Sequence, residues 1–328
     1  MTIKDVAAEA GVSVSSVSRY FNGGSLSPEK AQRIREAIER MGYRPNQAAQ
    51  TLRTGQQKQV GMIVPRIHSS AVSRVVAGVT STLQEAGYWV LLGNTDGDDA
   101  RELQYLELMQ ESRVAGILLM GTTLTHAKLD GMRRCQVPLV ITGQNFSGLP
   151  CVYHDDFQAV YELTARMLQK GRRNIAYIGV TEQDTASGLA RRKGAQAALT
   201  DAGLNGEYMP RAVSEFNVDD GHRQMQQLLA KYPTLDGVVC ATDTIAHGAM
   251  LALREAGRSV PDQVSVAGVG DSWADAISIP PLTTAQLYHE QCGQEAAKLL
   301  LGLIRGEAPA VPAKHIQLGY SIRERGSL

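Results

Sequence analysis

From residue 59 onward, short apolar runs alternate with helical patterns, and this alternation restricts the fold more than any other feature of the chain. Each run is short enough to be a strand buried on both faces, with a helix following most of them. Parallel strands need such crossover helices, so the pattern predicts parallel sheets covered by helices on both sides. The runs occupy residues 60–64, 89–93, 116–120, 138–142, 174–179, 237–241 and 264–270.

These strand and helix units form two consecutive series, which predicts two doubly wound α/β lobes. Ligands in open parallel sheets bind beyond the carboxyl ends of the strands, so we expect a binding site in the cleft between the lobes. The predicted helices lie near 69–87, 98–111, 126–134, 155–170, 187–203, 217–231, 243–257 and 288–305, with further strands near 209–213 and 314–320.

Composition and charge restrict the class of protein. The chain has 328 residues, 43% of them hydrophobic and 20% charged, which suits a globular protein of two or three domains. The first ten residues lack the apolar core of an export signal, and no apolar run is long enough to cross a membrane, so we expect a cytoplasmic protein. Residues 1–58 hold nine Lys or Arg and five acids, whereas the whole chain has no net charge. A basic segment of this kind favours a nucleic-acid partner.

The four cysteines and seven histidines give no sign of a metal or cofactor. Both residue types are scattered, without the spacing of a metal site, and isolated thiols favour a reducing compartment. The motifs of serine hydrolases, zinc proteases and phosphate-binding loops are absent. We therefore expect a protein without cofactors that is not an enzyme.

The first 45 residues predict three short helices around one small core. Thr2 is suited to cap the first helix together with Asp5, and Gly11 is suited to end it. A second helix follows after only a few residues, and Ser27-Pro28 begins a third. A helix, a short turn containing glycine and a second helix make up the helix-turn-helix motif of DNA-binding proteins.

The second helix carries residues suited to the major groove of DNA. Short side chains let a helix approach the bases closely, and an arginine can bind guanine O6 and N7 with two hydrogen bonds. We place the exposed, DNA-reading face at Val14, Ser15, Ser16, Ser18 and Arg19, with further DNA contacts at Thr2, Ser13 and Asn22.

The runs T-I-K-D-V-A-A-E-A-G-V-S-V-S-S-V-S-R-Y-F-N and G-Y-R-P-N-Q-A-A-Q-T-L-R resemble the lactose/galactose repressor (LacI/GalR) family, and the resemblance extends over essentially the whole chain. It implies that residues 46–54 are a hinge helix. In that family two copies of the hinge helix enter the minor groove, which adds Asn46, Ala49 and Leu52 to the expected DNA contacts. Leu52 then inserts between base pairs and bends the duplex. Unstacking the base pairs costs free energy, and the additional contacts between the protein and the bent DNA offset that cost.

The resemblance also implies the domain boundaries. We expect an all-α DNA-binding domain at 1–45, a hinge at 46–58 and a periplasmic-binding-protein-like α/β body at 59–328. The family's chain crosses between the lobes three times. On that basis, lobe 1 takes 59–157 and 288–307, and lobe 2 takes 158–287 and 308–328.

Residues that follow the predicted strands are the candidate effector contacts. Aspartates accept paired hydroxyl hydrogen bonds, an arginine donates a fork, and an aromatic ring covers the apolar face of a sugar, so the set suits a polyol. The resemblance assigns effector contact to Arg191 and Asp243 in particular. Helix capping is an equally good interpretation of Asp155, Asp156 and Asp243. The predicted contacts are Arg66, His68, Ser69, Asn94, Thr122, Gln144, Phe146, Asp184, Arg191, Asp243, Asp271 and Trp273.

These observations predict a homodimeric repressor of a carbohydrate operon that reads a pseudo-palindromic operator and is released by its effector. The segments V-P-R-I-H-S, G-Q-N-F, H-D-D-F and A-T-D-T-I-A resemble sucrose- and trehalose-type repressors, which favours a disaccharide or a sugar phosphate. Gly270 stands where many sugar-binding members carry an acid. A corepressor-dependent regulator is one alternative. A solute-binding protein is another, although it would need an export signal at residues 1–58.

Overall fold

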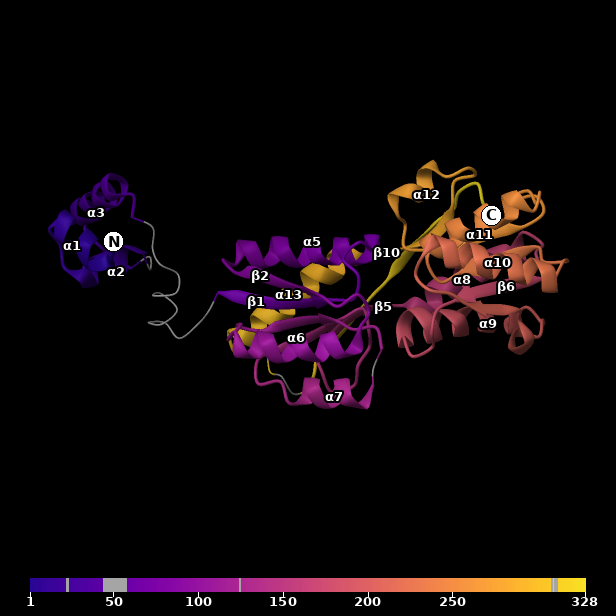
Figure 1. The fold of residues 1–328 in the computed structure, drawn as a ribbon, viewed down its shortest axis with the longest axis horizontal. Helices are drawn as coiled ribbons and strands as arrows, with labels where there is room; N and C mark the ends of the chain where they lie inside the picture. Colours follow the sequence, from indigo (N-terminus) through magenta and orange to yellow (C-terminus); the bar gives the residue numbers. More distant parts are fainter. Residues whose placement is uncertain (22–23, 44–57, 124, 308, 310–311) are drawn as a thin grey trace. The chain divides into compact units, whose positions relative to one another are not determined.

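The computed structural model describes residues 1–21, 24–43, 58–123, 125–307, 309 and 312–328. Contacts divide the chain into two units, Met1–Gln57 and Lys58–Leu328, and each is considered by itself (Figure 1). Within the described residues, no helix is long and apolar enough to span a membrane. The same residues contain no group of three or more His, Cys, Asp or Glu placed to hold a metal ion.

The first unit contains the three predicted helices, α1 (Ile3–Ala10), α2 (Val14–Phe21) and α3 (Pro28–Met41). Asp5 accepts hydrogen bonds from the backbone nitrogen of Thr2 at 2.7 Å and from its hydroxyl at 3.1 Å. Gly11 ends α1 in the left-handed conformation, with φ of 60°. The buried core is Val6, Ala7, Ala10, Val17, Ile34 and Ala37.

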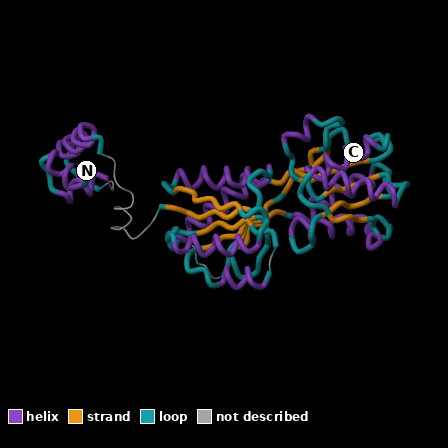
Figure 2. The backbone as a smooth tube through the Cα atoms, in the orientation of Figure 1, coloured by secondary structure: helices purple, strands orange, loops and turns teal. Residues whose placement is uncertain are grey.

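The second unit contains two lobes, each with a six-stranded sheet between layers of helices (Figure 2). Lobe 1 has the strand order β11-β5-β4-β3-β1-β2, all parallel. Helices α5 and α13 pack together, and α6 contacts α7. The elements are β1 (Gln59–Val64), α5 (Ser70–Glu85), β2 (Trp89–Asn94), α6 (Asp99–Glu111), β3 (Ile117–Met120), α7 (His126–Arg133), β4 (Leu139–Thr142), β5 (Cys151–His154), α13 (His289–Ile304) and β11 (His315–Leu318).

Lobe 2 has the strand order β12-β10-β9-β8-β6-β7, and only β12 is antiparallel to its neighbour. Helices α8 and α9 form one packed pair, and α10 and α11 form another. The elements are α8 (Asp156–Gln169), β6 (Ile175–Gly179), the π-helix η1 (Thr185–Ala190), α9 (Arg191–Asp201), the short helix η2 (Gly206–Tyr208), β7 (Arg211–Val213), α10 (Val218–Lys231), β8 (Gly237–Cys240), α11 (Asp243–Glu255), β9 (Ser265–Val269), α12 (Trp273–Ile277), β10 (Thr283–Leu287) and β12 (Tyr320–Arg323).

The structure corrects the expected course of the tail. A single strand near 314–320 was expected in lobe 2, but two strands form there. β11 pairs with β5 of lobe 1, and β12 pairs with β10 of lobe 2. Residues up to Leu318 therefore belong to lobe 1, and the third crossing lies at Gly319. The other crossings lie between β5 and α8 and between β10 and α13.

Candidate functional site

The exposed face of α2 carries most of the predicted DNA-reading residues. Val14 is 41% exposed, and Ser15 and Arg19 are exposed as well. Arg19 has no ion-pair partner among the residues described here. Ser13 and Thr2 are exposed at the starts of α2 and α1, and Ser18 is half-buried. Asn22, Asn46, Ala49 and Leu52 lie outside the described residues.

Ser16 corrects the expected reading face, because it is buried. The Ser13 hydroxyl accepts a hydrogen bond from the Ser16 backbone nitrogen at 3.2 Å and lies 2.9 Å from the Ser16 hydroxyl. Ser13 thus caps the first turn of α2 and covers Ser16. Ser15 and Arg19 remain as exposed polar residues of the predicted reading face on α2.

A cavity of about 390 Å³ opens between the two lobes of the second unit. Its walls are formed at the carboxyl ends of the strands, as expected for doubly wound sheets. Nine of the twelve predicted effector contacts line it: Arg66, His68, Ser69, Thr122, Gln144, Asp184, Arg191, Asp243 and Trp273.

Three predicted contacts do not line the cavity because each is engaged elsewhere. Asn94 accepts a hydrogen bond from the backbone nitrogen of Ile67 at 3.0 Å and thereby supports the loop after β1. Phe146 packs into the core of lobe 1. Asp271 forms an ion pair with Arg325, with 2.5 Å between Oδ1 and the guanidinium nitrogen.

Two predicted contacts bind each other across the cleft. The Gln144 side-chain nitrogen donates to Asp184 Oδ1 at 2.7 Å, and its oxygen accepts from the Thr185 hydroxyl at 2.5 Å. Asp184 also caps η1 by accepting from the backbone nitrogen of Ser187 at 2.8 Å. Burial raises the pKa of Asp184. Gln144 and Asp184 therefore hold the lobes together on one side of the cavity.

Two arginines of lobe 1 make further contacts with lobe 2. The Arg66 guanidinium lies 4.1 Å from the centre of the Phe216 ring, an arrangement that attracts a cation to an aromatic face. Arg74, on α5, donates to the Gly270 carbonyl at 2.5 Å and to the Asp271 carbonyl at 3.3 Å. Neither arginine has a carboxylate within ion-pair distance among the described side chains. Both arginines line the cavity, where Asp184 and Glu215 lie near enough to stabilise the charge of Arg66.

Arg191 is held by groups within lobe 2. Its Nε donates to Asp156 Oδ1 at 2.7 Å, and another guanidinium nitrogen donates to the Ala241 carbonyl at 2.5 Å. The side chains of Arg191 and Asp156 are 8% and 5% exposed. Asp156 therefore binds Arg191 rather than capping α8, whose cap is Asp155. Similarly, Thr242 rather than Asp243 caps α11.

Several residues that line the cavity carry no signal in the sequence. Arg74 and His247 come from the sides of helices, where no strand end marks them. His154 and His289 lie at two of the crossings, with ring centres 5.2 Å apart. Burial lowers the pKa of both histidines, and the neighbouring Arg74 and Arg191 lower it further. Placing these residues in the cavity requires knowing where the chain crosses between lobes.

Comparisons with known proteins match both units. Residues 2–46 match the family model described as bacterial regulatory proteins, lacI family, and residues 57–320 match that of periplasmic binding proteins and the sugar binding domain of the LacI family. The sucrose operon repressor of Staphylococcus xylosus is 34% identical over 92% of this chain and 93% of its own. Catabolite control protein A of Priestia megaterium is 28% identical over 100% and 99%.

Solved structures give the same result. The chain resembles the transcriptional regulator CelR in its cellobiose complex, with a TM-score of 0.78, 28% identity and coverage of 100% of this chain and 99% of the other. It also resembles the lac repressor dimer bound to operator and the anti-inducer ONPF, with a TM-score of 0.90, 24% identity and coverage of 100% and 98%. At that identity the second likeness concerns the fold alone.

Proposed function

This chain belongs to the LacI family of bacterial regulatory proteins, and we propose that it is a cytoplasmic repressor of a carbohydrate-utilisation operon. A sugar or sugar phosphate that binds between the lobes releases the repressor from operator DNA. The observation that carries the proposal is the presence in one chain of α2, whose outer face is exposed, and of a cavity lined by hydrogen-bonding side chains at the strand ends of a two-lobed body. The relatives are transcriptional regulators, and we propose by extension that this protein has no catalytic activity.

On the DNA side, α2 lies in the major groove with Arg19 at a guanine and Ser15 at a phosphate or base edge. Asn46, Ala49 and Leu52 contribute minor-groove contacts, with Leu52 as the wedge that bends the duplex. The basic charge of residues 1–58 supplies attraction to phosphates that depends on salt.

On the effector side, the lining of the cavity suits a carbohydrate. Arg191, His154 and Thr122 offer hydrogen-bonding groups, and Trp273 offers an aromatic face that is 78% exposed. The guanidinium groups of Arg66 and Arg74 in the cavity lining favour a ligand with an acidic group, which supports a sugar phosphate. The sucrose operon repressor and the CelR–cellobiose complex support a disaccharide unit.

Release follows from coupling between the two sites. An effector that competes with the contacts of Gln144 or Arg74 changes the angle between the lobes, which separates the paired hinge helices and weakens operator binding. Coupling of this kind is typically about 1–3 kcal/mol. A corepressor would bind in the same cavity but would strengthen operator binding.

The first prediction concerns the effector. In a thermal-shift screen that pairs sucrose, trehalose and cellobiose with their phosphate esters, we expect one ester to stabilise the protein. Ligand at 100 times its Kd stabilises the folded state by about 2.7 kcal/mol. The same ester should lower operator affinity in a gel shift. Tighter operator binding would establish a corepressor, and turnover of the sugar would exclude the proposal.

Exposed apolar side chains support a homodimer. Trp89 and Leu91 are 65% and 41% exposed on β2, which is an edge strand of its sheet. In lobe 2, Ile277 and Ile279 are 68% and 94% exposed at the end of α12. Edge strands with apolar surface tend to pair with another chain, and a second copy supplies the two-fold symmetry that a palindromic operator requires.

The second prediction tests this interface. The double variant Trp89→Glu/Ile277→Glu should be a monomer at micromolar concentration by light scattering, because it places two charges inside the proposed contact. Tyr208→Glu is the matched control, since Tyr208 is 79% exposed on η2, away from both patches. A variant that stays dimeric would remove these patches from the interface.

A further inference from the structure

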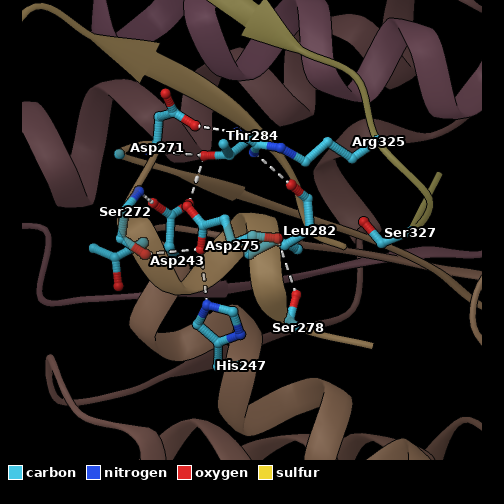
Figure 3. Close-up of polar contacts among 12 residues, drawn as sticks. Asp243, His247, Asp271, Ser272, Asp275, Ser278, Leu282, Thr284, Arg325 and Ser327 are labelled. Carbon is cyan, nitrogen blue, oxygen red and sulfur yellow. Dashed lines mark hydrogen bonds and ion pairs between the residues drawn. The ribbon is translucent and has the colours of Figure 1, made fainter. Parts of the chain in front are cut away.

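Two buried carboxyl groups lie side by side at the cavity wall. Asp243 at the start of α11 is 4% exposed, and Asp275 on α12 is fully buried. Figure 3 shows the two side chains facing each other, with Thr284 and Ser272 around Asp243 and with His247 beside Asp275. Asp243 lines the cavity, whereas Asp275 lies behind it.

Each carboxyl group accepts hydrogen bonds, but one oxygen remains without a partner. Asp243 accepts from the Thr284 hydroxyl at 2.5 Å and from the Ser272 backbone nitrogen at 3.2 Å. Asp275 Oδ1 accepts from the Ser272 hydroxyl at 2.9 Å and lies 2.7 Å from His247 Nε2. Asp275 Oδ2 is buried with no hydrogen-bond partner among the described residues. An unpartnered carboxylate oxygen in this position is costly unless a proton lies on it or on its neighbour.

The surrounding charges do not neutralise two carboxylates. Within the described part of the chain, His247 is the only basic side chain within ion-pair distance of either group. Arg325 binds Asp271, and Arg74 binds the carbonyls of Gly270 and Asp271. Cys240 is buried in β8 nearby, and burial, followed by the charge of Asp243, raises the pKa of its thiol. Two like charges at contact distance in a dry site are strongly unfavourable.

We propose that Asp243 and Asp275 share one proton, and that Asp275 is the positioning residue for this wall of the cavity. One bond pattern then connects the wall. Asp275 holds Ser272 and His247 in place by hydrogen bonds, and both of these residues line the cavity. The shared proton links Asp275 to Asp243. Gly270 fits this arrangement, because a Cβ there would lie 2.6 Å from Asp243 Oδ2.

The direction of the pH dependence follows from burial. Burial and the neighbouring Asp275 raise the pKa of Asp243 well above its ordinary value, so the folded protein binds this proton more tightly than the unfolded chain. The stabilisation is complete below the ordinary pKa of aspartate and is lost as the pH rises through the folded value. The stability of the wild type should therefore decline as the pH rises from the ordinary pKa of aspartate to the folded pKa of Asp243.

The test compares Asp275→Asn with Asp275→Ala. The amide of the asparagine donates a hydrogen bond where the shared proton lay. This variant should therefore keep the wild-type Tm and lose the decline of stability with rising pH. The alanine variant leaves Ser272 and His247 without their partner and should lower Tm by about 2–4 °C or more. Asp271→Asn is the matched control: it removes an acid from the same loop and should leave the decline in place.

Infrared difference spectra of the full chain give a direct readout. At neutral pH, wild type should show the carbonyl stretch of a protonated carboxylic acid, and Asp275→Asn should lack it. Wild-type spectra without that band, a band that survives in Asp275→Asn, or an asparagine variant as unstable as the alanine variant would each overturn the proposal. None of these readouts involves an effector or an operator, so they do not depend on the proposed function.

Discussion

Replacing Arg191 with alanine is expected to destabilise the two-lobed body by about 3–5 kcal/mol, because it leaves a buried carboxylate without a partner. Arg191 binds Asp156 and the Ala241 carbonyl, and both side chains of the pair are almost fully buried. Losing the cation leaves Asp156 to hold its charge in a dry site or to take up a proton. Arg191 also lines the cavity, so we expect the variant to lose its response to effector.

Equilibrium unfolding in urea measures this effect. Arg101→Ala is a suitable control, since Arg101 pairs with Asp96 and Asp98 on the surface, where such pairs contribute about 0–1 kcal/mol. The double variant Arg191→Leu/Asp156→Leu should recover most of the lost stability, because replacing both partners leaves no buried charge. If Arg191→Ala unfolds within about 1 kcal/mol of wild type, the ion pair does not have the role assigned to it.

Replacing Arg19 with alanine is expected to weaken operator binding by about 1–3 kcal/mol and to relax the base preference at one position of each half-site. Arg19 lies in the last turn of α2, and its side chain is exposed. The loss should be larger on the preferred sequence than on random DNA, since phosphate contacts bind all sequences alike.

Arg40→Ala separates base reading from general charge. It removes the same charge from the same unit, but Arg40 lies on α3 and pairs with Glu9 at 2.7 Å. Binding of the two variants to a set of operators with single base changes distinguishes their roles. A profile of base preference that is the same for Arg19→Ala as for wild type would remove Arg19 from the reading face.

Much of the fold was predictable because it depends on local patterns. The apolar runs and helical spacings located most strands and helices to within a few residues. The strands β5 and β10 were missed because each is only four or five residues long and includes polar residues. The split of the tail into β11 and β12 was missed because the two strands pair with different lobes.

The residues at the strand ends of the candidate site were predictable, but the contacts between opposite sides of the site were not. A residue that follows a strand lies at the carboxyl edge of its sheet, and this rule placed Arg66, Thr122 and Asp243 in the cavity wall. The rule gives no information about which residue of the opposite lobe faces it. For that reason, the Gln144–Asp184 contact between lobes and the Asp243–Asp275 pair emerged only from the structure.

The central claim is that occupancy of the cavity controls operator binding by α2, and one titration tests it most directly. An operator selected from random DNA by the full-length protein is labelled, and binding is followed by fluorescence anisotropy at low salt with and without the stabilising sugar. We expect a specific complex on a pseudo-palindrome that the sugar weakens by about 5–150-fold. Equal affinity for random DNA, or operator binding that no tested sugar or sugar phosphate alters, would contradict the account.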